Sequence, residues 1–175
     1  TDFNHPLNDW DVSSVTDTRE MFRDANSFNQ PLNEWDVSSV TTMSGMFWNA
    51  SSFNQPLNEW NVSSVTAMHY MFSGATDFNH PLNDWDVSSV TDMRYMFWSA
   101  SSFNQPLNDW NVGSATQVSS IFNNADAFLA SPNCYSVSVW DHPTVTTDDC
   151  TSASVHYALA TTKEWLEKEY NDRFC

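Results

Sequence analysis

Residues 28–52 read FNQPLNEWDVSSVTTMSGMFWNASS, and residues 53–77 repeat this segment as FNQPLNEWNVSSVTAMHYMFSGATD without an insertion or deletion. This 25-residue unit occurs five times, and each copy opens with a phenylalanine: Phe3, Phe28, Phe53, Phe78 and Phe103. A period of this length is typical of stacked supersecondary units that share one continuous core. The sequence therefore predicts a stack in which each repeat position becomes a column of side chains.

The composition restricts the classes of partner. The 175 residues carry 22 acidic and six basic side chains, which gives a formal net charge of −16. This charge repels phosphates, so neither nucleic acid nor an anionic membrane surface is an expected partner. The sequence has no run of about 18 apolar residues, so no membrane insertion is predicted. The hydrophobic content of 41% is enough for a packed interior rather than a disordered chain.

The first half of the repeat has the spacing of a short strand. In the second copy, Leu32, Trp35 and Val37 follow the Leu-x-x-Leu-x-Leu step of leucine-rich repeats. Trp35 and Val37 lie two residues apart, so both are predicted to point inward while Glu34 and Asp36 point outward. Each strand would pair in parallel with the same strand of the next copy.

The second half of the repeat has helical spacing. Val40, Met43, Met46 and Ala50 recur at intervals of three and four, which predicts one or two turns of helix. Asparagine fills two further columns, where stacked amides are expected to bond one another or loop backbone. These columns are Asn4, Asn29, Asn54, Asn79 and Asn104, and Asn8, Asn33, Asn58, Asn83 and Asn108.

The combined pattern Phe-Asn-x-Pro-Leu-x-x-Trp-x-Val-Ser-x-Val-Thr-x-Met-x-x-Met-Phe resembles the BspA-like class of leucine-rich repeats. The resemblance covers residues 1–127, which hold the five repeats. It implies an α/β repeat solenoid, a right-handed leucine-rich-repeat-like stack with a parallel β-sheet on one face and short helices on the other. It also implies display on a cell surface and adhesion or partner binding. The family brings no catalytic residues, so the chain is not expected to be an enzyme.

Residues 128–175 depart from the pattern and are predicted to form a C-terminal cap. An uncapped stack would leave its last apolar face and strand edge bare, which favours aggregation. Thr161 is a suitable N-cap, and Glu164 follows three residues later as its capping-box partner. This arrangement predicts a final helix at about residues 162–173.

Three cysteines lie in this C-terminal segment: Cys134, Cys150 and Cys175. They allow one disulfide, either Cys134 with Cys150 or Cys150 with Cys175, and the spacing does not choose between the two. Either bond suits an oxidising compartment, in agreement with an extracellular or cell-surface localisation.

The sharpest functional feature is a pair of acidic columns. The first column is acidic in every copy, and the second, two residues later, has asparagine in place of aspartate in two of the five copies. The first contains Asp9, Glu34, Glu59, Asp84 and Asp109, and the second contains Asp11, Asp36, Asn61, Asp86 and Asn111. Like charges on neighbouring rungs about 5 Å apart repel by about 0.8 kcal/mol in bulk water and about 3 kcal/mol at an effective dielectric of 20.

Three interpretations of the acidic columns stay open. They can form a solvated face that keeps the protein soluble. They can bind calcium weakly between rungs, since carboxylates are calcium ligands, although the EF-hand loop motif is missing. They can also contact a basic protein or a mineral.

The aromatic residues divide into two groups. The column Trp10, Trp35, Trp60, Trp85 and Trp110 holds the inward position and is predicted to be core. Trp48 and Trp98 occupy a position where other copies carry Arg23, Ser73 and Asn123, so they are candidates for an exposed contact patch. Partial cover by neighbouring helix residues is the alternative for this pair.

The sequence therefore favours a recognition or adhesion module that binds a protein or glycan through its acidic strand face, with no cofactor. The alternative is a structural protein that binds calcium or mineral along the carboxylate ladder. Titration with calcium separates the two hypotheses. Catalysis is not expected, because an active site needs unlike groups converging in one pocket and the repeats offer like groups in rows.

Overall fold

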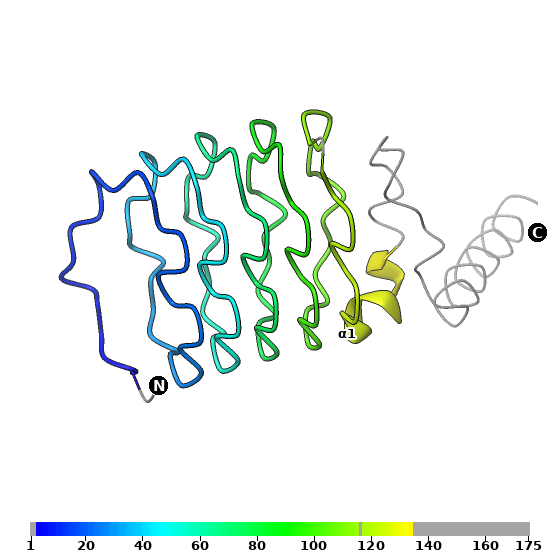
Figure 1. Cartoon of the computed structure of the whole chain (residues 1–175), viewed down its shortest axis with the longest axis horizontal. Helices are drawn as coiled ribbons and strands as arrows, with labels where there is room; N and C mark the ends of the chain where they lie inside the picture. The colour runs from blue at the N-terminus through cyan, green and yellow to red at the C-terminus, as the bar shows by residue number, and fades with distance from the viewer. Residues whose placement is uncertain (1–2, 116, 135–175) are drawn as a thin grey trace, which may run out of the picture.

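The computed structural model describes residues 3–115 and 117–134. Its successive repeats lie side by side as coils along the long axis of the molecule, in the order of the chain from the N-terminal end (Figure 1). The predicted stack with a regular 25-residue spacing is therefore present. The elements inside each coil differ from those predicted.

Each coil is a series of β-turns. In the second copy, the backbone N–H of Trp35 donates to the carbonyl of Leu32 at 3.1 Å, and that of Val40 donates to Val37 at 2.9 Å. Two more such bonds join Met46 to Met43 at 3.1 Å and Ala50 to Phe47 at 3.0 Å. The apolar residues thus occupy the first and fourth positions of turns, whose ends lie on the same side of the chain. This arrangement turns them all toward the interior of the coil.

The coils are joined by backbone hydrogen bonds in the second half of the repeat. Every other N–H there donates to a carbonyl 24 residues later, as when Phe47 donates to Met71 at 2.9 Å. The N–H groups between them close turns within the same coil, as when Trp48 donates to Gly45 at 3.0 Å. The pairing is parallel. It appears as isolated bridges between successive coils, which join Asp17 to Thr42, Thr42 to Ala67, Ala67 to Asp92 and Asp92 to Gln117.

Two columns of this segment have left-handed backbone. The φ angle is +63° at Gly45 and +69° at Gly74, and eight other residues share this region. Those residues are Glu20, Asp24, Asn49, Tyr70, Tyr95, Ser99, Ser120 and Asn124. A left-handed residue at every fourth position breaks both helix and extended strand.

The predicted strands and short helices are therefore wrong for the described residues. Residues 32–37 make no backbone bonds to the next coil and belong to turns. Parallel pairing occurs instead at residues 42–49 and their equivalents, where helices were predicted. Among the described residues the one α-helix is the four-residue α1 (Asp126–Leu129), followed by a short 3₁₀ turn at residues 132–134.

The interior is built from two interlocking phenylalanine ladders and a tryptophan ladder. Phe28 and Phe53 stack at 6.0 Å between ring centroids, and Phe47 packs against Phe53 at 4.0 Å. The indole N–H of Trp60 donates to the carbonyl of Leu32 in the preceding coil at 2.8 Å. Each inward tryptophan from the second to the fifth copy makes the equivalent bond, so the rings are buried with their polar atom satisfied.

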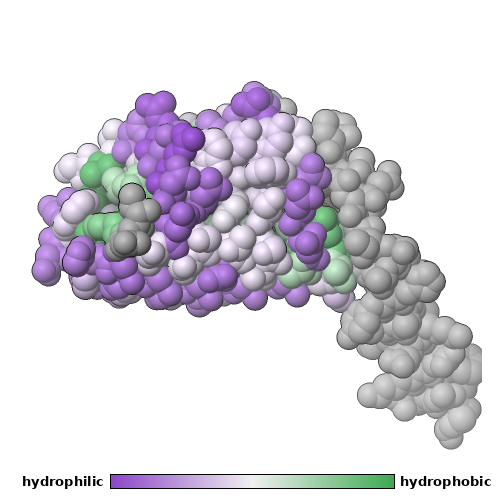
Figure 2. All heavy atoms as spheres, turned by 60° about the horizontal axis from the view of Figure 1, so that its bottom comes forward, coloured by the Kyte–Doolittle hydropathy of each residue, from purple (hydrophilic) through white to green (hydrophobic). Residues whose placement is uncertain are grey.

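The prediction of an inward tryptophan column is confirmed for Trp35, Trp60, Trp85 and Trp110, which are at most 5% exposed. Trp10 is 55% exposed, because no described coil covers it at this end of the stack. Phe3 and Met21 are also exposed, and Figure 2 shows hydrophobic patches toward the same end.

The C-terminal predictions fall mostly outside the described residues. The helix at 162–173, Cys150 and Cys175 all lie beyond residue 134. Cys134 is buried, and the disulfide pairing stays a prediction. No helix within residues 3–115 and 117–134 combines the length and the apolarity that a membrane crossing requires.

Candidate functional site

Most polar columns of the repeat hold the coils together. The amide oxygen of Asn29 accepts the backbone N–H of Asn54 at 3.0 Å, and Gln55 donates to the same oxygen at 2.9 Å. Equivalent bonds link Asn4 to Asn29 and Asn79 to Asn104. The prediction that this asparagine column bonds loop backbone is confirmed, so its side chains are structural.

The second acidic column has a structural task of the same kind. Asp36 accepts the backbone N–H of Ser38 at 3.0 Å and its hydroxyl at 2.6 Å. Asn61 does the same with Ser63, at 3.2 and 2.7 Å. Because one side-chain oxygen suffices, aspartate and asparagine are interchangeable in this column. These bonds, from the serine hydroxyl and then its N–H, lower the pKa of Asp11, Asp36 and Asp86.

The first acidic column is exposed in all five copies: Asp9, Glu34, Glu59, Asp84 and Asp109. Glu59 and Asp109 are bonded by neighbouring asparagines, as when Asn83 bonds Asp109 through both its amide oxygen and its amide nitrogen. Asn111, in the second column, bonds the N–H of Gly113. Within the described residues, no three His, Cys, Asp or Glu side chains gather where they could hold a metal ion.

Among the columns that differ from copy to copy, four surround the arginines and the outer aromatic rings, and we call these four together the variable face. They lie at positions 17, 19, 20 and 23 of the first copy and every 25 residues after it. The columns are Asp17, Thr42, Ala67, Asp92 and Gln117; Arg19, Ser44, His69, Arg94 and Ser119; Glu20, Gly45, Tyr70, Tyr95 and Ser120; and Arg23, Trp48, Ser73, Trp98 and Asn123. Every arginine of residues 3–134 belongs to this face, and no lysine occurs there.

A stack of rings runs along the variable face. Trp48 stacks on Tyr70 at 4.9 Å, and Tyr70 stacks on Tyr95 at 4.8 Å. The guanidinium carbon of Arg23 lies 4.0 Å from the centroid of the Trp48 ring, and the two groups form a cation–π contact. Trp98 is 38% exposed, whereas Trp48 is half-buried with its faces covered, so the two tryptophans of this column differ.

The arginines of this face are paired. Arg19 makes a forked contact with Asp17, as close as 2.6 Å, and Arg94 makes one with Asp92 at 2.8 Å. Burial raises the pKa of Asp92, but bonds from Arg94 and the nearby His69 outweigh burial and hold it below its usual value. The face therefore presents fixed charges of both signs.

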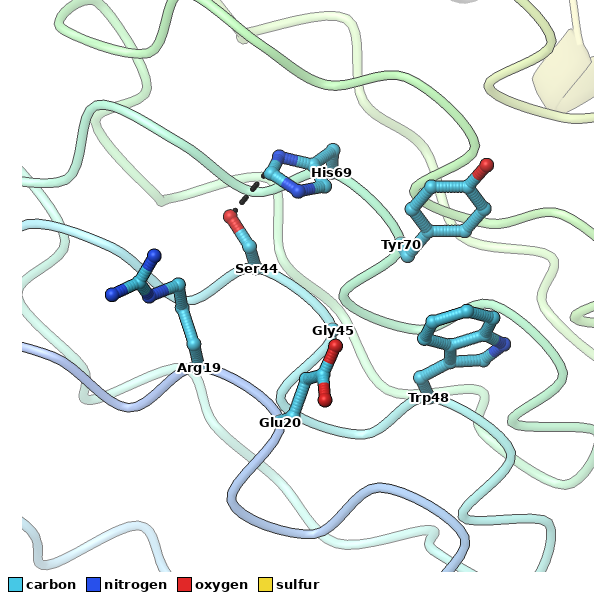
Figure 3. A pocket seen from close by; sticks show the side chains of 7 residues that line it. All are labelled: Arg19, Glu20, Ser44, Gly45, Trp48, His69 and Tyr70. Carbon is cyan, nitrogen blue, oxygen red and sulfur yellow. Dashed lines mark hydrogen bonds between the residues drawn. The ribbon is translucent and has the colours of Figure 1, made fainter.

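A cavity of about 290 Å³ opens on this face (Figure 3). Its lining comes from three successive copies: Arg19, Glu20, Ser44, Gly45, Trp48, His69 and Tyr70. Gly45 adds only backbone to this lining, and the Trp48 ring takes the place next to Tyr70 in the stack. In Figure 3 the polar groups of Arg19, Ser44 and His69 lie on one side and the two rings on the other.

A serine, a histidine and an aspartate meet beside the cavity. The Nδ1 atom of His69 lies 3.1 Å from the hydroxyl of Ser44 and 3.3 Å from the carboxylate of Asp92. In a Ser-His-Asp triad the two partners contact opposite ring nitrogens. Here both contact the same nitrogen and Ser44 is buried, so the group lacks the geometry of a nucleophilic triad.

Sequence reasoning singled out Trp48 and Trp98 but missed the cavity and the columns around it. The acidic columns, which it favoured, do not line the cavity. The available signal was the contrast between columns, since Leu32, Trp35 and Val37 recur unchanged in every copy while the column of position 45 holds four residue types in five copies. A glycine within a column of larger side chains marks a place where the surface has no side chain.

Comparison with known proteins gives a family match that covers the repeats. A family model described as "Mycoplasma protein of unknown function, DUF285" matches residues 1–68 and 32–135. The two matches overlap and together span more than half of the chain, as expected where one model can align with different sets of repeats. No curated protein matches the chain. No solved structure matches it either.

Proposed function

Because the chain belongs to the DUF285 family, whose function is unknown, we propose that it is a non-catalytic recognition module that binds a protein or glycan through the variable face. The module would act outside the cell or on its surface. The resemblance of the repeat to the BspA-like class supports this setting, since it implies display and adhesion. The strands and helices of the leucine-rich fold are not part of the proposal.

One observation carries the proposal: the repeat separates into columns that build the frame and columns that vary. Frame columns are buried or bonded to the next coil, and they recur almost unchanged. The variable face instead concentrates tryptophan, tyrosine and arginine, the residue types that dominate binding energy at interfaces. Variation on a constant frame is what a surface needs to distinguish one partner from another.

The acidic columns take a secondary part in this proposal. The second column is used to close turns, and the first is exposed without a converging metal site among the described residues. Fourteen carboxylates against three guanidinium groups in residues 3–134 give a negative field around the variable face. Such a field speeds the approach of a positively charged or neutral partner and repels anionic ones.

A screen of protein and glycan arrays tests the proposal, using the wild-type protein and two variants. In the blank-face variant, exposed variable positions take the residues of the fifth copy: R23N, W48N, H69S, Y70S, R94S, Y95S and W98N. In the acidic-column variant, Glu34, Glu59, Asp84 and Asp109 become their amides. We expect the blank-face variant to lose more than about 30-fold in affinity, since a single hot-spot residue is worth about 2 kcal/mol or more.

The acidic-column variant serves as the control, and its affinity should change less than tenfold. The proposal is contradicted if a folded blank-face variant keeps wild-type affinity while the acidic-column variant loses it. Circular dichroism of both variants shows whether the coils remain intact.

A further inference from the structure

The cavity at Gly45 lies beside a stack of larger side chains. Glu20 precedes the gap and Tyr70 follows it, while a β-carbon placed on Gly45 would lie 3.3 Å from the Glu20 side chain and 3.7 Å from the Trp48 ring. The volume of about 290 Å³ is at the lower end of pockets that hold small molecules. A group bound here would lie over the Gly45 backbone, beside the Trp48 ring.

The ring edges, rather than the ring faces, border this cavity. One face of Trp48 is covered by Tyr70 and the other by Arg23, and Tyr70 lies between Trp48 and Tyr95. No face is left for a cation, because Arg23 already occupies the cation–π position. Aromatic edges carry partial positive charge and therefore favour contact with oxygen atoms.

The polar lining combines hydrogen-bond donors with an acceptor, and its guanidinium and carboxylate groups carry opposite charges. Arg19 uses Nε and Nη2 on Asp17, so its Nη1 makes no bond within the described residues. Glu20 uses Oε2 on Arg23, and His69 uses Nδ1 on Ser44 and Asp92. Three groups at one cavity are thus left with an atom for a ligand: a guanidinium donor, a carboxylate acceptor and the Nε2 of an imidazole.

The charges of these groups decide which kind of ligand the cavity favours. An anion would be attracted by Arg19 but opposed by Glu20 and by the net charge of −16. A cation would be attracted by Glu20 but opposed by Arg19, and it would find no open ring face. A neutral group with several hydroxyls can accept from Arg19 and donate to Glu20 at once. A single side-chain amide offers one acceptor oxygen and one NH₂ group, fewer polar groups than a sugar residue carries.

We propose that the cavity at Gly45 binds one neutral sugar residue, such as the terminal unit of an uncharged glycan. This assignment rests on the proposed function and names the ligand class for one part of the variable face. The sugar ring would lie over the Gly45 backbone, its hydroxyls would meet Arg19, Glu20 and His69, and its oxygens would contact the edges of Trp48 and Tyr70.

The test is a titration of the ¹⁵N-labelled protein, observed through the indole N–H of Trp48. The probes are the methyl glycosides of glucose, galactose, mannose and N-acetylglucosamine, together with glucuronic acid and glucosamine as charged analogues. We expect at least one neutral glycoside to bind saturably with a Kd on the order of millimolar, as its small size allows. Both charged analogues should bind at least tenfold more weakly than their neutral counterpart.

Gly45→Tyr is the decisive variant, because Tyr70 and Tyr95 show that the column accepts tyrosine at the same backbone angle. It should fill the cavity and abolish the response. Ser120→Tyr makes a comparable change in the same column of the fifth copy and should bind like the wild type. Arg19→Ala and Glu20→Ala should each weaken binding about fivefold, the effect of one lost hydrogen bond.

The assignment is overturned if no neutral glycoside binds, if Gly45→Tyr binds as well as the wild type, or if a charged analogue binds best. A response to asparagine- or glutamine-containing peptides in place of sugars also overturns it. The array result separates this failure from failure of the proposed function. A partner lost by the blank-face variant but kept by Gly45→Tyr leaves the recognition face standing and removes only the sugar.

Discussion

At the scale of single residues, each repeat position occurs once in every one of the five copies. A residue that differs from the others in its column changes the structure of one coil only. Gly45 opens a cavity where other copies carry glutamate, tyrosine or serine. Gly74 occupies the second left-handed column, where other copies carry Asp24, Asn49, Ser99 and Asn124. An added β-carbon would lie 3.3 Å from the Glu20 side chain at Gly45 and 2.5 Å from Asn49 at Gly74, so the neighbouring contact is tighter at Gly74.

Replacing Gly74 with alanine should destabilise the fold by about 2 kcal/mol. The φ angle of +69° is strained for any L residue, and the added β-carbon would lie 2.5 Å from the amide oxygen of Asn49. Asn49 cannot move away freely, because its amide nitrogen bonds Asp24 at 2.9 Å. Urea unfolding measures the change.

Ser99→Ala is the matched control, since Ser99 occupies the same column at +57° and already has a β-carbon. Its free energy of unfolding should change by less than about 0.5 kcal/mol. Equal effects of the two substitutions would show that the contact with Asn49 has no energetic weight. In an Asn49→Ala background, Gly74→Ala should cost less than in the wild type.

Asp36 gives the fold a specific dependence on acid. Its pKa is lowered by Ser38, so its contribution to stability is fully present above the ordinary value of 3.8 and is lost as the pH falls through the lower folded value. Asp36→Asn should keep the turn, as Asn61 does in the third copy, without this titration. Thermal unfolding at pH 7 should then be nearly unchanged.

Below pH 4 the melting temperature of the wild type should fall relative to that of Asp36→Asn. Ser38→Ala is the companion variant, because it removes the hydroxyl bond and should reduce the same acid dependence. Parallel melting curves for the wild type and Asp36→Asn from pH 7 to pH 3 would contradict this role of Asp36.

At the scale of elements, each coil is stabilised by bonds that cross to its neighbour. Trp60→Phe should destabilise the protein by about 2–3 kcal/mol, because it leaves the Leu32 carbonyl without its indole partner and leaves a void in the core. Trp10→Phe is the control at an exposed end position and should change stability by less than about 0.5 kcal/mol. Chemical denaturation compares the two, and equal losses would contradict the importance of the crossing bond.

The elements also show how far sequence reasoning reaches. The inward set that includes Trp35, Val37 and Met43 follows from periodicity and is buried as predicted. The helix predicted at Val40, Met43 and Met46 fails because the ends of a β-turn, three residues apart, share a side just as helix residues do. Spacing alone does not separate these two geometries.

At several positions, the residue type does not indicate that the backbone is left-handed. Tyr70 and Tyr95 adopt φ angles near +57°, although bulky residues rarely do so, because the bonds of the stack determine their conformation. The sequence did not reveal the cavity either, because its lining combines residues of three successive copies, such as Glu20, Gly45 and His69. The acidic columns were easy to find, but hydrogen bonds between neighbours account for the second of them.

At the scale of the whole molecule, a constant frame carries a surface that changes from rung to rung. Nearest-neighbour contacts between coils make such stacks tolerant of exchanges that do not touch the frame. The inward rings and bonded asparagines are the frame, and the arginines, tyrosines and exposed tryptophan lie together on the variable face. Recognition would use the part of the repeat that the fold does not need.

The most direct measurement is hydroxyl-radical footprinting of the wild-type protein, alone and with the partner that the array screen identifies. Trp98 is 38% exposed and Trp10 is 55% exposed, so both are oxidised readily in the free protein, and Trp10 is the internal reference away from the variable face. We predict that the partner protects Trp98, Tyr70 and Tyr95 while oxidation of Trp10 stays unchanged. Unchanged oxidation of Trp98, with protection confined to residues outside the variable face, would contradict the account.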